Sequence, residues 1–141
     1  VWVVDGLDFV EQAVAEAQKR AKAAAVQDKI TFHHADITDL SFLKEPYDLA
    51  VDVGCAHALD QEQWKRHHRE LRRLLQPGAT YLFYGRVLDR HEENPRGFDE
   101  PVILDLLTDG FTLHHAEHGL TEMDDGTSWR SVWYWWQRDE S

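Results

Sequence analysis

The sequence has few residues that could fix a structure covalently. Among its 141 residues there is one cysteine, Cys55. A single thiol excludes an internal disulfide framework and a cysteine-rich zinc site. The only methionine is Met123, and the chain opens within an apolar run at residues 1–4. Because domain ends are usually polar and loosely held, we expect further residues to precede this run.

Positive charge and long apolar segments are also scarce. Fifteen Lys and Arg residues stand against 26 Asp and Glu residues, which gives a net charge of −11. This excess of negative charge repels phosphate backbones and disfavours nucleic acid as a partner. No apolar run reaches 18 residues, and no basic segment leads into a shorter apolar one. We therefore expect a cytoplasmic protein with no membrane span and no signal peptide.

The composition that is present is typical of a globular protein, with 43% hydrophobic and 29% charged residues. The length allows one domain with its own core and does not allow two. We interpret residues 1–141 as a single domain that is incomplete at its N-terminus.

Apolar runs alternate with segments of helical periodicity along the chain. Strands are expected at residues 1–4, 29–35, 47–52, 80–84, 111–116 and 131–137, and helices at about 8–25, 60–76 and 101–109. This alternation indicates an α/β fold with a mainly parallel sheet. Asp8 with Glu11, and Asp60 with Gln63, have the spacing of capping boxes at helix starts. We expect the helix that begins near Asp60 to be stopped by the pair at 77–78.

Three expected strands end at residues suited to ligand binding, namely Asp8, Asp36 and the segment 52–55. In parallel sheets, ligands bind beyond the carboxyl ends of the strands. An acid in such a place accepts hydrogen bonds from ribose hydroxyls, and a second acid can accept one from an exocyclic amine. The alternatives are that Asp8 only caps its helix and that Asp36 only starts a turn.

The order of these motifs resembles a known family. Gly6-Leu7-Asp8 precedes an Ala-rich helix, and Asp36, Tyr47-Asp48-Leu49 and Leu74-Leu75-Gln76-Pro77-Gly78 follow in turn. This set is similar to class I S-adenosylmethionine-dependent methyltransferases over roughly residues 3–86. The resemblance implies a Rossmann-like fold with helices on both sheet faces and an antiparallel C-terminal strand pair. It also implies S-adenosylmethionine as cofactor and a small-molecule methyl acceptor as partner.

The resemblance assigns roles to particular residues. Asp8 would hold the ribose hydroxyls, and Asp36 with the Ile37 main chain would meet the adenine. Asp52 and Gly54 would lie beside the methionine part of the cofactor.

The segment 52–57 (DVGCAH) is also similar to a loop of the thiopurine-methyltransferase-like group, from which it departs at Val53 and Ala56. His57 is the candidate general base and Asp52 its orienting acid. The alternative is that His57 only packs near the start of a helix. No metal site is expected, because no HExxH or His/Cys pair occurs.

The family's Gly-rich loop and first strand are absent from these residues. Because that strand is the middle of the family's sheet, the strands ending at Asp8 and Asp36 should be separated from those ending at Asp52 and Tyr84. Upstream residues, another chain or a rearranged sheet would resolve this separation, and we expect upstream residues. The alternative function is a scaffold that binds no cofactor and acts in oligomerisation or protein interaction. A homo-oligomer is a possible assembly of this chain.

Overall fold

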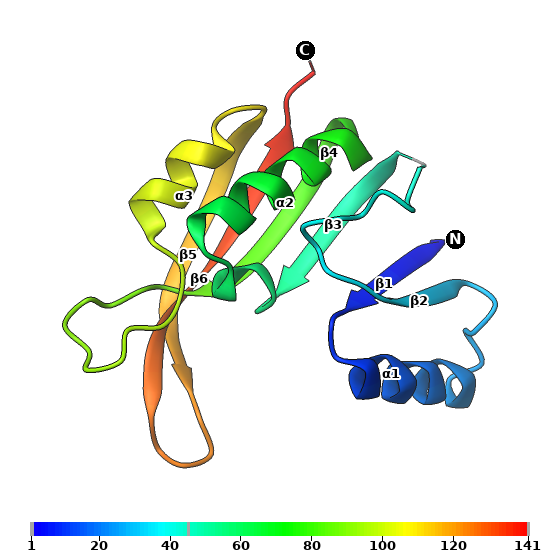
Figure 1. The fold of residues 1–141 in the computed structure, drawn as a ribbon, viewed down its shortest axis with the longest axis horizontal. Helices are drawn as coiled ribbons and strands as arrows, with labels where there is room; N and C mark the ends of the chain where they lie inside the picture. The colour runs from blue at the N-terminus through cyan, green and yellow to red at the C-terminus, as the bar shows by residue number, and fades with distance from the viewer. Residues whose placement is uncertain (1, 45, 141) are drawn as a thin grey trace. The chain divides into compact units, whose positions relative to one another are not determined.

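The structure is a computed structural model that describes residues 2–44 and 46–140. The chain divides into two compact units, one ending at Phe42 and the other beginning at Leu43. The strands and helices follow in the predicted order, with one short 3₁₀ helix in addition (Figure 1).

The first unit consists of two strands and one helix, β1 (Val4–Asp8), α1 (Glu11–Ala23) and β2 (Ile30–His34). The strands pair in parallel. The helix packs on this pair and buries Val14 and Ala21.

The start of α1 differs from the predicted capping box of Asp8 and Glu11. The N-cap is Val10, whose extended backbone precedes the first helical residue. Asp8 therefore lies two residues before the cap, and its Oδ1 accepts the Val10 N–H at 2.9 Å. The carboxylate fixes the turn between β1 and α1 instead of capping the helix.

The second unit contains a four-stranded sheet in the order β3-β4-β6-β5. These strands span β3 (Tyr47–Val53), β4 (Leu75–Arg86), β5 (Phe111–Glu122) and β6 (Ser128–Arg138). β3 and β4 are parallel, whereas β6 is antiparallel to both β4 and β5. This confirms the α/β class with an antiparallel C-terminal pair. Both strands of that pair are longer than predicted and form an extended hairpin.

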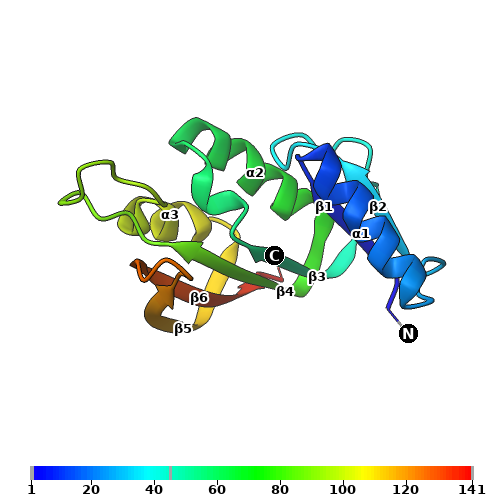
Figure 2. The same cartoon turned by 90° about the horizontal axis from the view of Figure 1, so that it is seen from below.

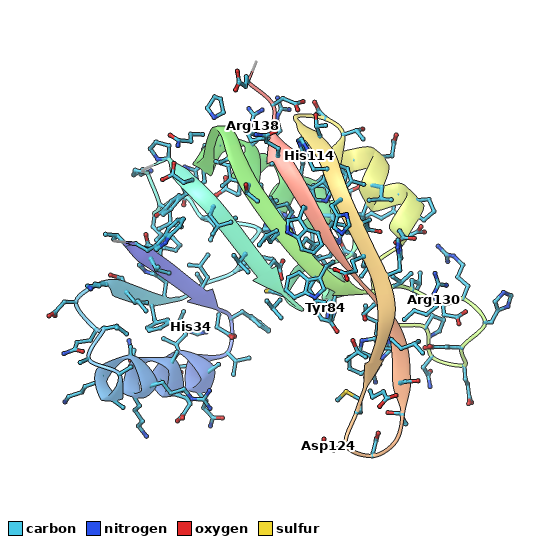
Figure 3. All side chains as sticks on the ribbon, turned by 180° about the vertical axis from the view of Figure 1, so that it is seen from behind. His34, Tyr84, His114, Asp124, Arg130 and Arg138 are labelled. Atoms are coloured by element: carbon cyan, nitrogen blue, oxygen red, sulfur yellow. The ribbon has the colours of Figure 1, made fainter. Side chains whose placement is uncertain are left out.

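The helices of the second unit are η1 (Ala56–Ala58), α2 (Gln61–Leu74) and α3 (Glu100–Leu107). Helices α2 and α3 lie on the same face of the sheet (Figures 1 and 2). Aromatic and aliphatic side chains fill the space between them and the strands. Those that are at most 2% exposed include Trp64, Tyr81, Phe83, Phe98, Ile103, Leu107, Phe111, Tyr134 and Trp136. Figure 3 shows the opposite face of this sheet.

The start of α2 agrees with the prediction, whereas its end comes earlier than predicted. The capping box forms, because Asp60 Oδ1 accepts the Gln63 N–H at 2.8 Å and the Gln63 side chain accepts the Asp60 N–H at 2.9 Å. The helix ends three residues before Pro77, and Leu75 already pairs with Tyr47 as the first residue of β4. A residue before proline avoids helical backbone angles, so the chain is extended before the proline is reached.

The strands of the two units form separate sheets, as the absence of a first strand predicted. Within the described residues β1 pairs only with β2, and β3 pairs only with β4. Large apolar side chains near both strands are exposed. Val3 is 79% exposed, and Val51 and Val53 are 56% and 64% exposed.

Candidate functional site

The loop after β3 is organised by a carboxylate. Asp52 Oδ1 accepts the Cys55 N–H at 2.8 Å, and its Oδ2 accepts the Ala56 N–H at 3.0 Å. Burial raises the pKa of Asp52 to about 6, although the two N–H groups lower it. Asp52 thus ties the end of β3 to the start of η1 and shapes the main chain between them.

Gly54 occupies a conformation that a side chain would disfavour. Its φ of +75° lies in the left-handed region, and its N–H donates to the Tyr84 carbonyl at 3.1 Å. A Cβ at Gly54 would lie 3.6 Å from the His57 ring, which is an ordinary contact. The backbone angle therefore selects glycine here, and the loop presents main chain without a side chain.

His57 lies over the carboxyl end of β4. Its ring Nδ1 accepts the Arg86 main-chain N–H at 2.8 Å. Burial, and secondarily the charge of Arg86, lower the pKa of His57, so the ring is neutral at pH 7. The contact that orients His57 is not the predicted contact with Asp52. The main-chain N–H of Arg86 holds the ring, whereas both Asp52 oxygens accept N–H groups of the loop.

In the first unit, Asp8 lies exposed at the carboxyl end of β1. One oxygen accepts the Val10 N–H, while no group of the described residues donates to its Oδ2. A carboxylate with an oxygen available to a hydroxyl donor fits a ribose.

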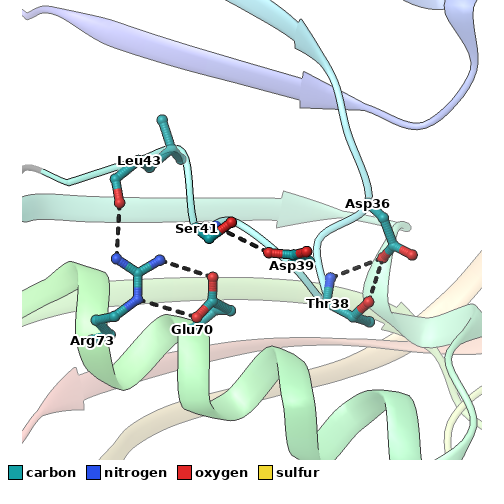
Figure 4. Close-up of polar contacts among 7 residues, drawn as sticks. All are labelled: Asp36, Thr38, Asp39, Ser41, Leu43, Glu70 and Arg73. Atoms are coloured by element: carbon teal, nitrogen blue, oxygen red, sulfur yellow. Dashed lines mark hydrogen bonds and ion pairs between the residues drawn. The ribbon is translucent and has the colours of Figure 1, made fainter.

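Asp36 follows the end of β2, and the Ala35 N–H donates to the Asp8 carbonyl at 3.0 Å. This bond brings the ends of β1 and β2 together. The Asp36 carboxylate accepts both the N–H and the hydroxyl of Thr38, at 2.9 and 2.8 Å, in a turn that contains Ile37 (Figure 4). The turn interpretation of Asp36 is therefore realised in the structure, and the turn sets the direction of the Ile37 main chain.

The predicted site residues thus form two groups. Asp8, Asp36 and Ile37 lie at one edge of the first unit, and Asp52, Gly54 and His57 lie in one loop of the second. Sequence reasoning missed the Arg86 main chain as the partner of His57. No sequence signal identifies that pairing, because the two residues are 29 positions apart and meet only through the fold.

The described part of the chain lacks two further features. It contains no cluster of three His, Cys, Asp or Glu side chains that could hold a metal ion. Among these same residues, no helix has both the length and the apolar character needed to cross a membrane.

Comparison with known proteins decides the family. A model of the family described as "Methyltransferase domain" matches residues 1–78, which is more than half of the chain. The chain belongs to this methyltransferase family. The match covers the whole first unit and, in the second, β3, the loop with Asp52 and His57, and α2.

Solved methyltransferases share the fold of this family member over almost its whole length. A SAM-dependent methyltransferase from Methanosarcina mazei is 19% identical with a TM-score of 0.80, covering 99% of this chain and 83% of that one. The N-methyltransferase NodS from Bradyrhizobium japonicum, in complex with S-adenosyl-L-homocysteine, is 19% identical with a TM-score of 0.78. That alignment covers 96% of this chain and 66% of NodS.

A curated relative from Haemophilus influenzae, described as an uncharacterized protein, is 28% identical over 126 residues. The match covers 86% of this methyltransferase-family chain and 50% of the relative. The chain therefore spans about half the length of that relative.

Proposed function

We propose that this protein transfers a methyl group from S-adenosylmethionine to a small-molecule acceptor in the cytoplasm. The observation that carries the proposal is the edge formed by β1 and β2, where the Ala35–Asp8 bond holds two acid-bearing strand ends together. Membership of the methyltransferase family supports the reaction class. The net charge of −11 favours a small acceptor over nucleic acid.

The residues of the first unit fit the adenosine part of the cofactor. Asp8 would accept hydrogen bonds from the ribose hydroxyls through the oxygen that Val10 does not use. The Asp36 turn would place the Ile37 main chain against the adenine edge, with the Asp36 carboxylate beside it.

The loop of the second unit fits the methionine part. Both Asp52 oxygens are occupied by loop amides, so Asp52 would act by holding the loop in shape. Gly54 would permit close approach of a ligand to the main chain. When bound, the cofactor supplies a methyl group on a sulfonium; the protein orients the two reactants and excludes water.

The test is calorimetric titration of the full-length protein with S-adenosylhomocysteine. Asp8→Ala should weaken binding by about 1–3 kcal/mol, because a charge-assisted hydrogen bond is lost. Asp28→Ala, which removes another exposed carboxylate of the first unit, is the matched control and should leave the affinity unchanged.

Equal affinity of the Asp8 and Asp28 variants would show that Asp8 only fixes the β1–α1 turn. Absence of binding to the full-length protein would overturn the proposed reaction. That result would favour the scaffold function instead.

A further inference from the structure

The contact between His57 and Arg86 fixes which ring nitrogen carries the proton. A main-chain N–H can only donate, so Nδ1, which lies 2.8 Å from the Arg86 nitrogen, must present its lone pair. A neutral imidazole carries one proton, and that proton must then lie on Nε2. His57 therefore has a hydrogen-bond donor at the nitrogen that points away from β4.

From this geometry we infer that His57 serves as a fixed Nε2–H donor to an oxygen of the methyl acceptor and does not act as the general base. The inference rests on the proposed methyl transfer. To act as a base, Nε2 would need a lone pair, which requires the proton to move to Nδ1. The Arg86 N–H would then lose its acceptor, at a cost typical of an unsatisfied polar group.

The packing of β4 beneath His57 holds the His57 Cβ close to the strand. A Cβ at Gly85 would lie 3.0 Å from the His57 Cβ, 2.7 Å from the Phe83 ring and 3.1 Å from the Phe98 ring. The main chain of β4 thus runs directly beneath His57 with no room for a side chain between them. This close fit fixes the position of the His57 Cβ over β4, and the Arg86 N–H then orients the ring.

The Nε2 side of the ring is different. The position of a Gly54 Cβ lies 3.8 Å from Nε2, so the glycine leaves open the space that a side chain would occupy. No group of the described residues accepts a hydrogen bond from Nε2, and β3 and β4 both end beside it. Ligands of parallel sheets bind beyond such ends, which makes this N–H available to one.

A donor in this position restricts the acceptor. In the transfer, the lone pair of the acceptor forms the new bond to carbon, while the sulfur–carbon bond breaks and its electron pair stays on sulfur. Any proton that the acceptor loses passes to water and not to His57. The substrate class is therefore an amine or thiol that loses its proton in solution and carries a neighbouring oxygen, rather than an alcohol.

The tautomer is measured by NMR of the full-length protein with ¹⁵N-labelled histidine and bound S-adenosylhomocysteine. The His57 signals are assigned by their loss in His57→Gln. We expect Nε2 to be protonated between pH 7 and 9, with His34, whose Nε2 faces the Phe9 carbonyl at 2.9 Å, as the internal reference for this tautomer. A proton on Nδ1 of His57 would overturn the inference and leave cofactor binding untouched.

The acceptor class is tested with three matched probes at pH 9, namely 3-aminopropanoate, 3-mercaptopropanoate and 3-hydroxypropanoate. Each carries the same carboxylate, so only the nucleophile differs. We expect transfer to the amine or the thiol. His57→Gln, which keeps a donor but cannot act as a base, should retain the rate within tenfold, whereas His57→Leu should lower it more than 100-fold.

Transfer to the hydroxyl probe alone, or to none of the three, contradicts the inference. Equal losses in the Gln and Leu variants contradict it as well. Failure of the proposed function is distinguished by calorimetry, because it would also abolish binding of S-adenosylhomocysteine.

Discussion

The two units hold their candidate binding residues in different ways. In the second unit, Asp52 and His57 are each fixed to main-chain N–H groups above a densely packed aromatic core. In the first unit, Asp8 is exposed at the end of a two-stranded pair that one helix covers. Main-chain N–H groups fix the carboxylates of the first unit as well, since Asp8 accepts the Val10 N–H and Asp36 the Thr38 N–H, so the difference between the units lies in the packing beneath these residues.

The difference in packing between the two units predicts which of them is more stable. A two-stranded sheet with one short helix is marginally stable by itself. The four-stranded sheet with two helices buries several whole aromatic side chains, each of which contributes strongly. We therefore expect the second unit to resist unfolding more than the first.

The largest effect should come from the aromatic core. Phe83→Ala, at a fully buried position, should lower the free energy of unfolding of the second unit by about 3–5 kcal/mol. The counterpart in the first unit, Val14→Ala, should cost about 1–2 kcal/mol, because less apolar surface is lost. Tryptophan fluorescence in denaturant reports the second unit, and amide hydrogen exchange of α1 reports the first. Similar losses in the free energy of unfolding at the two positions would contradict the difference in packing between the units.

The next effect is a pH dependence of the stability of the second unit. Folding raises the pKa of Asp52 from 3.8 to about 6, so the unfolded state releases its proton first as pH rises. This contribution to stability is therefore complete only below pH 3.8, is lost as pH rises through about 6, and falls by about 2 kcal/mol between pH 4 and pH 7. Asp52→Asn should lack that fall, and Asp28→Asn should keep it. Urea unfolding at pH 4 and pH 7 measures the difference, and parallel pH profiles of wild type and Asp52→Asn would contradict the burial effect.

The smallest effects should come from ion pairs, and they should differ between the units. Arg20 pairs with Glu16 on the exposed face of α1, so Arg20→Ala should cost about 0.5 kcal/mol or less. Arg73 makes two bonds to Glu70 and donates to the Leu43 carbonyl at 2.8 Å (Figure 4), so Arg73→Ala should cost about 1–2 kcal/mol. Hydrogen exchange of α1 and denaturant unfolding of the second unit provide the two values. A loss above 1 kcal/mol for Arg20→Ala would show that the α1 pair is more than a surface contact.

The sequence alone predicted the features that depend on local pattern. The order of elements followed from periodicity, the Asp60–Gln63 capping box from spacing, and the separation of the sheets from the absent strand. The end of α2 at Leu74 could not be predicted, because the pairing of Leu75 with Tyr47 competes with the helix and joins distant segments.

The candidate site was predictable to the same extent. The loop of residues 52–57 and the acids Asp8 and Asp36 could be located from their places near strand ends, although β1 spans Val4–Asp8 and not the expected residues 1–4. Their hydrogen-bond partners could not be predicted. Which nearby N–H groups Asp8 and Asp52 bind depends on backbone angles that only the folded chain sets. The ring of His57 is an extreme case, because its orientation depends on an N–H at the far end of β4.

The exposed valines of β3 have a practical consequence for the isolated chain. Within the described residues β3 pairs with β4 alone, and its exposed Val51 and Val53 are apolar surface on which further copies can add and aggregate. The net charge of −11 opposes this by keeping copies apart, and salt screens such repulsion within about 10 Å at 0.1 M. Buffers of low ionic strength should therefore keep the purified chain monodisperse, and high salt should favour precipitation.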